Sequence, residues 1–248
     1  MVEAAEPAPA EPAPIAESQA TRVLAAYTTA YTTGDLSSLM QLFTQDARGP
    51  SGGRDPAVYS ELLFEGEHIS PASLPGMAER TATLNSLSKS HAMSGWRLGW
   101  VVAPRSLADH LENLALCMLY GLPDFIQDAA CVALEANLPE LEAMREAYRQ
   151  RRDLVCASLE DCPGLRALKP DGGMFVMVDI RATGLSAQAF AERLLDRHGV
   201  SVLAGEAFGP SAAGHIRVGL VLGSAPLAEA CRRIAHCAAE LLEERCYA

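Results

Sequence analysis

Positive charge is scarce in this sequence of 248 residues, which carries 20 lysines and arginines against 31 aspartates and glutamates, a formal net charge of -11. A surface that binds duplex nucleic acid or an anionic membrane needs clustered basic side chains. No apolar run reaches the ~18 residues of a membrane-spanning helix, and the start lacks the basic and apolar regions of a signal peptide. We therefore expect no nucleic acid partner and no membrane partner, and a cytoplasmic protein that acts on small molecules.

Motifs for metal ions, nucleotides and serine nucleophiles are also missing. The seven cysteines contain no C-x-x-C pair, and the closest two lie six positions apart, which predicts reduced, mostly buried thiols. The six histidines form no H-E-x-x-H pair, and the chain has no G-x-S-x-G turn and no glycine-rich dinucleotide loop. Because each of these sites depends on such spacing, the sequence predicts no metal site.

The first 57 residues differ in composition from the remainder. Residues 1–20 carry four prolines, four glutamates and no basic residue, which leaves too little apolar surface to offset the entropy of ordering and predicts a disordered tail. Apolar residues at helical spacing predict two helices within residues 21–47. These form either a generic hairpin or a segment that faintly resembles the opening helices of folds related to nuclear transport factor 2. Residues 48–57, rich in glycine and proline, predict a linker.

Apolar periodicity predicts the elements of the remaining chain. We expect strands at 58–64, 81–86, 96–103, 171–180 (entered through a turn), 200–204 and 214–222. We expect helices at 105–121, 124–136, 138–160, 186–198 and 226–244. The charged stretch AMREAYRQRRDLV within the third helix is interpreted as a solvated helix face.

The strongest functional signal is one lysine set between small hydroxyl residues. Lys89 follows Ser86 and Ser88, and Arg97 stands eight positions after it. A lysine amine condenses with an aldehyde to form an imine once desolvation or a neighbouring cation lowers its pKa. Hydroxyls and the fixed fork of a guanidinium suit a dianionic phosphate. The stretch therefore predicts a pocket for pyridoxal phosphate.

This stretch resembles the S-x-[SA]-K and G-x-R-x-G signature of class I/II aminotransferases, and the similarity holds from about residue 58 to the C-terminus. The resemblance implies an α/β enzyme with a partial fold type I aminotransferase architecture, a truncated large-domain sheet plus an α+β small domain. Residues 58–137 would form part of the large domain that binds pyridoxal phosphate, and residues 138–248 the small C-terminal domain. Residues 1–57 would be an unrelated helical, partly disordered N-terminus ending in the linker.

The resemblance also implies roles for individual residues. Lys89 is expected to be the catalytic residue, which anchors pyridoxal phosphate and then moves the proton of the substrate α-carbon. The residues expected to bind the cofactor with it are Tyr59, Ser86, Ser88 and Arg97.

Arg217 is the expected substrate-binding residue. It lies in the otherwise apolar stretch HIRVGL, where a guanidinium is unfavourable unless an anion meets it. Its position matches the family arginine that binds the substrate α-carboxylate. The alternative is a structural salt bridge to a helix.

One position departs from the family pattern. The stretch VYSEL around Tyr59 resembles the D-E-V-Y-x-x-L segment of the family, whose aspartate pairs with the pyridine nitrogen of the cofactor. Three residues before Tyr59 stands Pro56, and Asp55 lies one position too early. On a strand, an offset of one residue turns a side chain to the opposite face, so Asp55 does not replace the missing aspartate.

Three further stretches, HLENLALCMLYG, GGMFVMVDI and SVLAGEAFGPSAAGHIR, are similar to transaminases that use L-arginine as donor and pyruvate as acceptor. The resemblance thus implies amino acid and keto acid substrates, and a homodimer. Family members run to roughly 400 residues, more than one average domain, so the chain resembles their C-terminal half. Three hypotheses stay open: a transaminase, a catalytically impaired remnant or cofactor-binding module, and a lyase or decarboxylase of the same fold.

Overall fold

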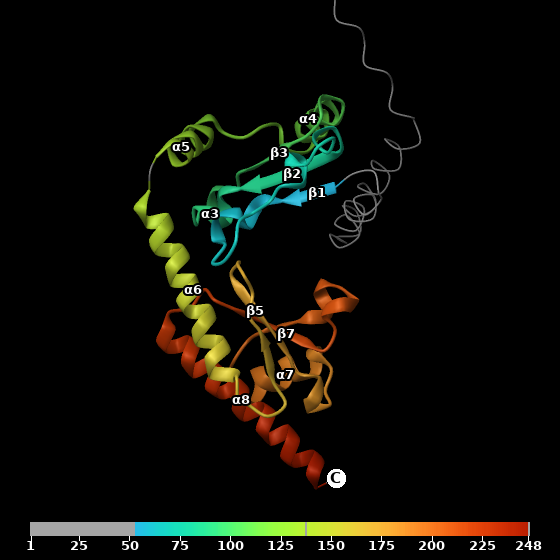
Figure 1. Ribbon diagram of the computed structural model, residues 1–248, viewed down its shortest axis with the longest axis vertical. Helices are drawn as coiled ribbons and strands as arrows, with labels where there is room; N and C mark the ends of the chain where they lie inside the picture. The colour runs from blue at the N-terminus through green and yellow to red at the C-terminus, as the bar shows by residue number, and fades with distance from the viewer. Residues whose placement is uncertain (1–52, 137, 248) are drawn as a thin grey trace, which may run out of the picture. The chain divides into compact units, whose positions relative to one another are not determined.

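The computed structural model describes residues 53–136 and 138–247 (Figure 1), and the expectations for the first 52 residues lie outside this part of the chain. None of the helices among the described residues is both long and apolar enough to cross a membrane. The described residues form two compact units. The first unit comprises residues 53–58, 69–87 and 95–130, and the second comprises residues 59–68, 88–94, 131–136 and 138–247.

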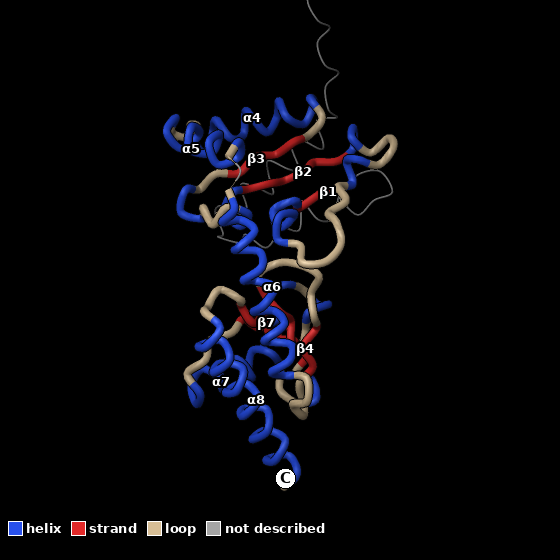
Figure 2. Tube along the Cα trace, turned by 60° about the vertical axis from the view of Figure 1, so that its left-hand side comes forward, coloured by secondary structure: helices blue, strands red, loops and turns tan. Residues whose placement is uncertain are grey.

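The first unit contains a three-stranded sheet in the order β1-β2-β3 (Figure 2). β1 (Gly53–Pro56) runs parallel to β2 (Thr81–Ser86), and β2 pairs antiparallel with β3 (Gly99–Val102). The strand predicted at 81–86 is confirmed. The linker predicted at 48–57 is wrong for Gly53–Pro56, whose backbone pairs with β2; Pro56 is tolerated because β1 is an edge strand.

The strand predicted at 58–64 is also wrong. The chain forms the 3-10 helix η2 (Ala57–Leu62) there, and the only strand-like contact that follows is an isolated bridge between Leu63 and Gly172. The Gly173 amide donates to the Leu62 carbonyl at 2.8 Å. A side chain at Gly172 would clash with that carbonyl, since a Cβ there would lie 2.7 Å from its oxygen. The segment is therefore fixed by a turn far along the chain, which local periodicity does not reveal.

The strand predicted at 96–103 is confirmed only from Gly99 to Val102. Ser94–Trp96 forms a 3-10 turn, η5, and Arg97 adopts a left-handed backbone conformation with φ 56°. Extended pairing cannot include a residue in that conformation, so Arg97 precedes the strand instead of lying on it.

The two long helices of this region match the prediction closely, whereas its short helices were not predicted. α3 (Leu87–Ser90), α4 (Arg105–Leu119) and α5 (Asp124–Glu135) follow β2 and β3 in the chain, and the short 3-10 helices η3 (Pro71–Ser73) and η4 (Ala78–Arg80) precede β2. α4 has no buried residue, and α5 buries only Ala130. Their apolar side chains are therefore largely exposed.

The second unit is a four-stranded antiparallel sheet covered by helices. Its strands stand in the order β4 (Arg166–Leu168), β5 (Phe175–Asp179), β7 (His215–Gly219) and β6 (Leu203–Ala204). β5 and β7 confirm predicted strands, β6 is shorter than predicted, and the three-residue β4 was not predicted. The helices are α6 (Pro139–Leu159), α7 (Ala187–His198) and α8 (Ser224–Cys246), with α6 and α8 side by side (Figure 1).

Strand alternation explains the core of this unit. The paired residues Val178 and Ile216 are fully buried, as are Val155 of α6, Phe190 of α7 and Ile234 of α8. Successive side chains of a strand point to opposite faces, so the helices cover one face of the sheet and the intervening side chains lie on the other. Burying these apolar side chains stabilises the unit by about 1.5–3 kcal/mol each.

The third predicted helix is confirmed as α6, but its charged stretch is not simply a solvated face. Arg152 is 1% exposed and Val155 is fully buried. The Arg152 guanidinium donates to the Pro170 carbonyl at 3.0 Å and lies 3.0 Å from the Glu65 carboxylate. It also lies 4.9 Å from the centre of the Phe64 ring. Through these contacts the buried Arg152 holds the segment around Phe64 against α6.

The helix ends follow ordinary capping chemistry. As predicted, the Ser186 hydroxyl caps α7 by accepting from the Ala189 amide, and Gly199 ends the helix with φ 65°. All seven cysteines are free thiols, but the prediction that most are buried is wrong, since only Cys231 and Cys237 are. Burial raises the pKa of the Cys231 thiol to about 11, which keeps it protonated and unreactive.

Candidate active site

Lys89 lies in α3, the single helical turn that directly follows β2 in the chain. Its side chain is half-buried, as is that of Ser88, and Ser90 next to it is buried with its hydroxyl 2.8 Å from Nδ1 of His91. Open α/β sheets bind ligands beyond the carboxyl ends of their strands. The turn after β2 is thus a suitable place for a reactive amine.

Ser86 and the neighbourhood of Arg97 are brought together within the first unit. Ser86 is paired with Gly99 in the β2–β3 ladder, and its hydroxyl donates to the carbonyl oxygen of Leu98 at 2.9 Å. A Cβ at Gly99 would lie 2.8 Å from the carbonyl oxygen of Asn85, so this close pairing requires glycine. Arg97 itself is exposed, and its left-handed backbone costs about 1–3 kcal/mol. Such strain is often found at binding sites.

Tyr59 belongs to the second unit. It lies in η2, is half-buried, and packs against the hydrophobic core formed by the sheet and helices of that unit. The expected site residues are therefore divided between the units. Ser86 and Arg97 belong to the first, and Tyr59, Ser88, Lys89 and Arg217 belong to the second.

Arg217 stands on the face of the sheet opposite the helices. Its neighbours Ile216 and Val218 are buried, and its guanidinium carbon lies 4.1 Å from the centre of the Phe175 ring and 5.0 Å from that of Phe208. No carboxylate of the described residues pairs with it. Two aromatic rings attract the cation without using its hydrogen-bond donors, so the fork remains available to an external carboxylate. The expected alternative, a salt bridge to a helix, is absent among the described residues.

Two residues that contact the expected site residues or their neighbours in the chain were not identified from the sequence. Phe208 ends the 3-10 helix η7 (Gly205–Phe208), and no local pattern pairs it with Arg217. Arg152 holds the segment around Phe64, which follows Tyr59 in the chain. Neither residue belongs to a recognisable motif, so only the tertiary structure could identify them.

Asp179, at the end of β5, has a structural position. It accepts hydrogen bonds from the Arg181 amide at 3.0 Å and from the Arg181 guanidinium at 2.9 Å. The side-chain hydrogen bond from Arg181 lowers the pKa of Asp179 to about 2. The carboxylate is thus engaged in holding the turn after β5 and is not a candidate acid or base.

The types of side chain expected at this site suit pyridoxal phosphate in two of three respects. A primary amine at Lys89 matches the aldehyde, and the hydroxyls of Ser86 and Ser88 with the Arg97 guanidinium match the phosphate. The third requirement is an acid opposite the pyridine nitrogen. Pro56, the last residue of β1, stands three positions before Tyr59 in the sequence, where that acid is expected, and proline has no ionisable side chain.

Comparison with known proteins identifies the family to which the chain belongs. The model of the family described as "aminotransferase class I and II" matches residues 57–234 of this chain. Arginine–pyruvate transaminase AruH of Pseudomonas aeruginosa is 84% identical over 185 residues, covering 75% of this chain and 47% of that protein. An aspartate aminotransferase of Pyrococcus abyssi is 37% identical over 180 residues, covering 71% and 46%.

Solved structures give the same result. An aromatic aminotransferase from Pyrococcus horikoshii superimposes with a TM-score of 0.73 and 36% identity, covering 78% of this chain and 52% of that one. An aspartate aminotransferase of Thermus thermophilus gives 0.70 and 32%, covering 82% and 54%. The chain is a member of the class I/II aminotransferase family and has an α/β fold of type I. It spans about half the length of the curated relatives it matches.

Proposed function

We propose that the protein is a pyridoxal phosphate-dependent aminotransferase that transfers the α-amino group of L-arginine to a keto acid such as pyruvate. The observation that carries the proposal is the Arg217 guanidinium, which lies against two aromatic rings and has no acidic partner among the described residues. The donor and acceptor are proposed on the 84% identity to a protein named arginine–pyruvate transaminase.

Lys89 would hold the cofactor and, once its amine is released, move a proton from the substrate α-carbon. Pyridoxal phosphate, when bound, supplies the electron sink that stabilises negative charge at that carbon. Ser86, Ser88 and Arg97 would bind the phosphate, and Tyr59 the phenolic oxygen. A bidentate pair between Arg217 and the substrate α-carboxylate would fix the orientation of the α-carbon.

The proposal also covers the domains, the oligomeric state and the compartment of the protein. We assign cofactor binding to residues 58–137 and the substrate-binding small domain to residues 138–248, and we propose a cytoplasmic homodimer. These assignments are supported by the family to which the chain belongs.

A second candidate is a cofactor-binding module without turnover. It is favoured by one observation, the proline at position 56 where the family has its pyridine-nitrogen acid. Without that acid the cofactor withdraws electrons less strongly, so binding would persist while proton removal slowed.

Turnover of L-arginine tests the first candidate against the second. Purified protein with pyridoxal phosphate, L-arginine and pyruvate should form alanine and the keto acid of arginine, detected by mass spectrometry. Arg217→Lys should raise KM roughly tenfold or more with the cofactor spectrum unchanged, because lysine cannot form the bidentate pair. Arg105→Lys is the control, since Arg105 is 93% exposed on α4.

The remaining outcomes separate the hypotheses. Bound cofactor without either product supports the module and contradicts the transaminase. Continuous consumption of L-arginine without pyruvate and without the keto acid, such as release of carbon dioxide, indicates a lyase or decarboxylase. Unchanged kinetics in Arg217→Lys would remove Arg217 from the substrate site.

A further inference from the structure

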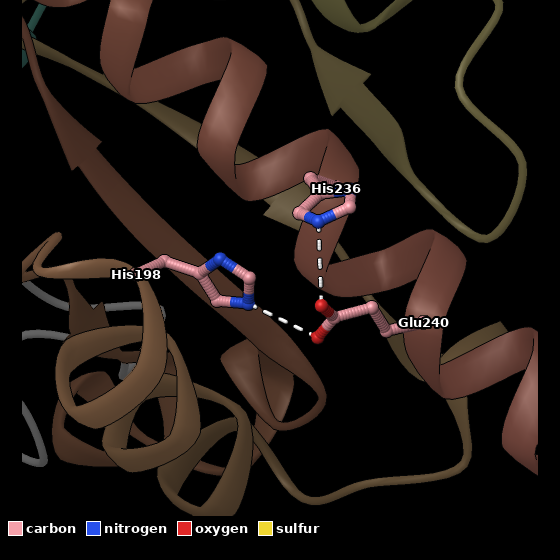
Figure 3. A group of neighbouring side chains, drawn as sticks. All are labelled: His198, His236 and Glu240. Carbon is pink, nitrogen blue, oxygen red and sulfur yellow. Dashed lines mark hydrogen bonds and ion pairs between the residues drawn. The ribbon is translucent and has the colours of Figure 1, made fainter.

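A group of two histidines and one glutamate lies on the second unit, outside the candidate active site. His198 is the last residue of α7, and His236 and Glu240 lie on α8 (Figure 3). The sequence predicts no metal site here because His198 is remote in the chain from the other two. The fold nevertheless directs all three side chains toward one another.

The backbone of His198 is held in place by its surroundings. Gly199 ends α7 in the left-handed conformation, with its amide donating to the Leu195 carbonyl at 3.0 Å. The guanidinium of Arg233, on α8, donates to the His198 carbonyl at 3.0 Å. The end of α7 is thus tied directly to α8.

His236 and Glu240 are arranged by helix geometry alone. Residues four apart on a helix lie on the same face, one turn above the other. The adjacent Cys237 and Leu241 are buried in the core, 0% and 4% exposed, which fixes the rotation of α8 about its axis. The two side chains therefore face His198 without rearrangement of the backbone.

The donor atoms are already close to metal-binding distances. Nε2 of His198 lies 3.2 Å from Oε2 of Glu240, and Nε2 of His236 lies 3.3 Å from Oε1 (Figure 3). One ligand atom from each residue lies within 4.8 Å of the others. Tetrahedral zinc, with bonds of about 2.0–2.1 Å to nitrogen, has ligand atoms roughly 3.3–3.5 Å apart. Small side-chain rotations would bring all three onto one ion.

Charge and exposure also suit a bound cation. Two imidazoles in the neutral form that binds metal and one carboxylate carry a net charge of -1, and the Arg193 guanidinium is a competing cation that lies 3.8 Å from the Glu240 carboxylate. Arg193 has a closer partner, because its Nη1 donates to Glu244 at 2.9 Å. The His198 side chain is 9% exposed and that of His236 65%. The group is therefore open to solvent on one side, where water could complete the coordination.

We propose that His198, His236 and Glu240 bind one divalent transition-metal ion, which cross-links the end of α7 to α8. A donor set of two imidazole nitrogens and one carboxylate favours zinc, copper, nickel or cobalt over magnesium or calcium, which prefer oxygen ligands. An ion bound only by the folded state stabilises it. The site is separate from the candidate active site and does not depend on the proposed function.

Zinc titration of the full chain tests this assignment. Isothermal titration calorimetry is carried out with the accessible thiols alkylated, because cysteine also binds zinc; the buried Cys231 and Cys237 stay unmodified in every variant. The wild type should bind one ion more per chain than His236→Ala, or bind that ion at least ~10-fold more tightly. Loss of a residue that only hydrogen-bonds to a metal ligand already reduces metal affinity by about 10–100-fold, so loss of a ligand should reduce it at least as much. Glu240→Gln should lose the same ion, whereas His110→Ala, at an exposed histidine of α4, should keep it.

Thermal unfolding gives a second readout. Zinc should raise the melting temperature of the wild type and of His110→Ala, and leave that of His236→Ala unchanged. Equal stoichiometry and affinity in all variants would overturn the proposal and leave a network of hydrogen bonds only. An anomalous difference peak at the zinc edge in crystals would have to lie between the three side chains, and a peak elsewhere would also overturn it.

Discussion

The two units of the chain differ in how they bury apolar surface. Every member of the buried hydrophobic cluster belongs to the second unit, where three helices cover one face of the antiparallel sheet. In the described part of the first unit the buried side chains are Thr81, Leu87 and Ala130. Phe125 there is 68% exposed and Leu119 60%. Among the described residues, the buried apolar surface that favours folding therefore lies mainly in the second unit, whereas the lysine motif begins on the sheet of the first.

Truncating one phenylalanine in each unit is the strongest way to break this comparison. Phe190→Ala, at a fully buried position of α7, should lower the free energy of unfolding by about 3–5 kcal/mol, because it removes buried surface and leaves a cavity. Phe125→Ala, at an exposed position of α5, should change it by less than about 1 kcal/mol. Urea unfolding followed by circular dichroism measures both, and equal losses would refute the difference between the units.

Within the second unit, a buried and an exposed arginine of α6 can be compared, and the buried one is Arg152. Arg152→Ala should lower the free energy of unfolding by about 2–3 kcal/mol, because the Pro170 carbonyl loses its donor and the stacking on Phe64 is lost. This loss of unfolding free energy is smaller than the loss expected when one partner of a fully buried ion pair is removed, because Glu65 is 55% exposed and can be hydrated.

The matched control for this change is Arg149→Ala on the same helix. Arg149 is 48% exposed and pairs with Glu146, so its removal should lower the free energy of unfolding far less than removal of Arg152. If Arg149→Ala proved as harmful as Arg152→Ala, the burial of Arg152 would not be the reason for its importance.

Acid should reveal the smallest of these effects, at Asp179. Hydrogen bonding to Arg181 depresses the pKa of Asp179 to about 2 in the folded state, below its ordinary value of about 3.9. A depressed carboxyl pKa stabilises the fold above about pH 4, and this contribution is lost as pH falls from about 4 to 2. Because Arg181 is 63% exposed, we expect about 1 kcal/mol after screening by solvent.

Asp179→Asn isolates that contribution. The difference in unfolding free energy between the wild type and Asp179→Asn should be largest at pH 6 and should narrow at pH 3. A difference that is constant between these pH values would mean that ionisation of Asp179 does not stabilise the turn after β5.

Local patterns predicted most of the fold. The periodicity of apolar residues located α4 to α8 and the strands β2, β5 and β7, because the apolar side chains of these elements recur at helical or strand spacing in the sequence. The failures have non-local causes. The chain after Tyr59 is held by a turn at residues 171–173, and Arg152 by a carboxylate and a carbonyl far along the chain. No window of neighbouring residues contains these partners.

The candidate site divides in the same way. Lys89, Ser86, Ser88 and Arg97 lie within twelve positions of one another, so a motif identifies them together. The contacts of Arg217 with Phe175 and Phe208 depend on strand pairing and on a separate turn. The group formed by His198 with residues of α8 likewise requires the packing of two helices.

Covalent labelling of the cofactor lysine is the most direct test of the account. The sequence contains only two lysines, Lys89 and Lys169, and Lys169 lies 3.4 Å from the Asp153 carboxylate. Protein mixed with pyridoxal phosphate, reduced with borohydride and digested should carry the label on the Lys89 peptide. The label should persist in Lys169→Ala and disappear in Lys89→Ala. Label on Lys169 or on the N-terminal amine, with Lys89 unmodified, would contradict the assignment of this chain as a pyridoxal phosphate enzyme acting through Lys89.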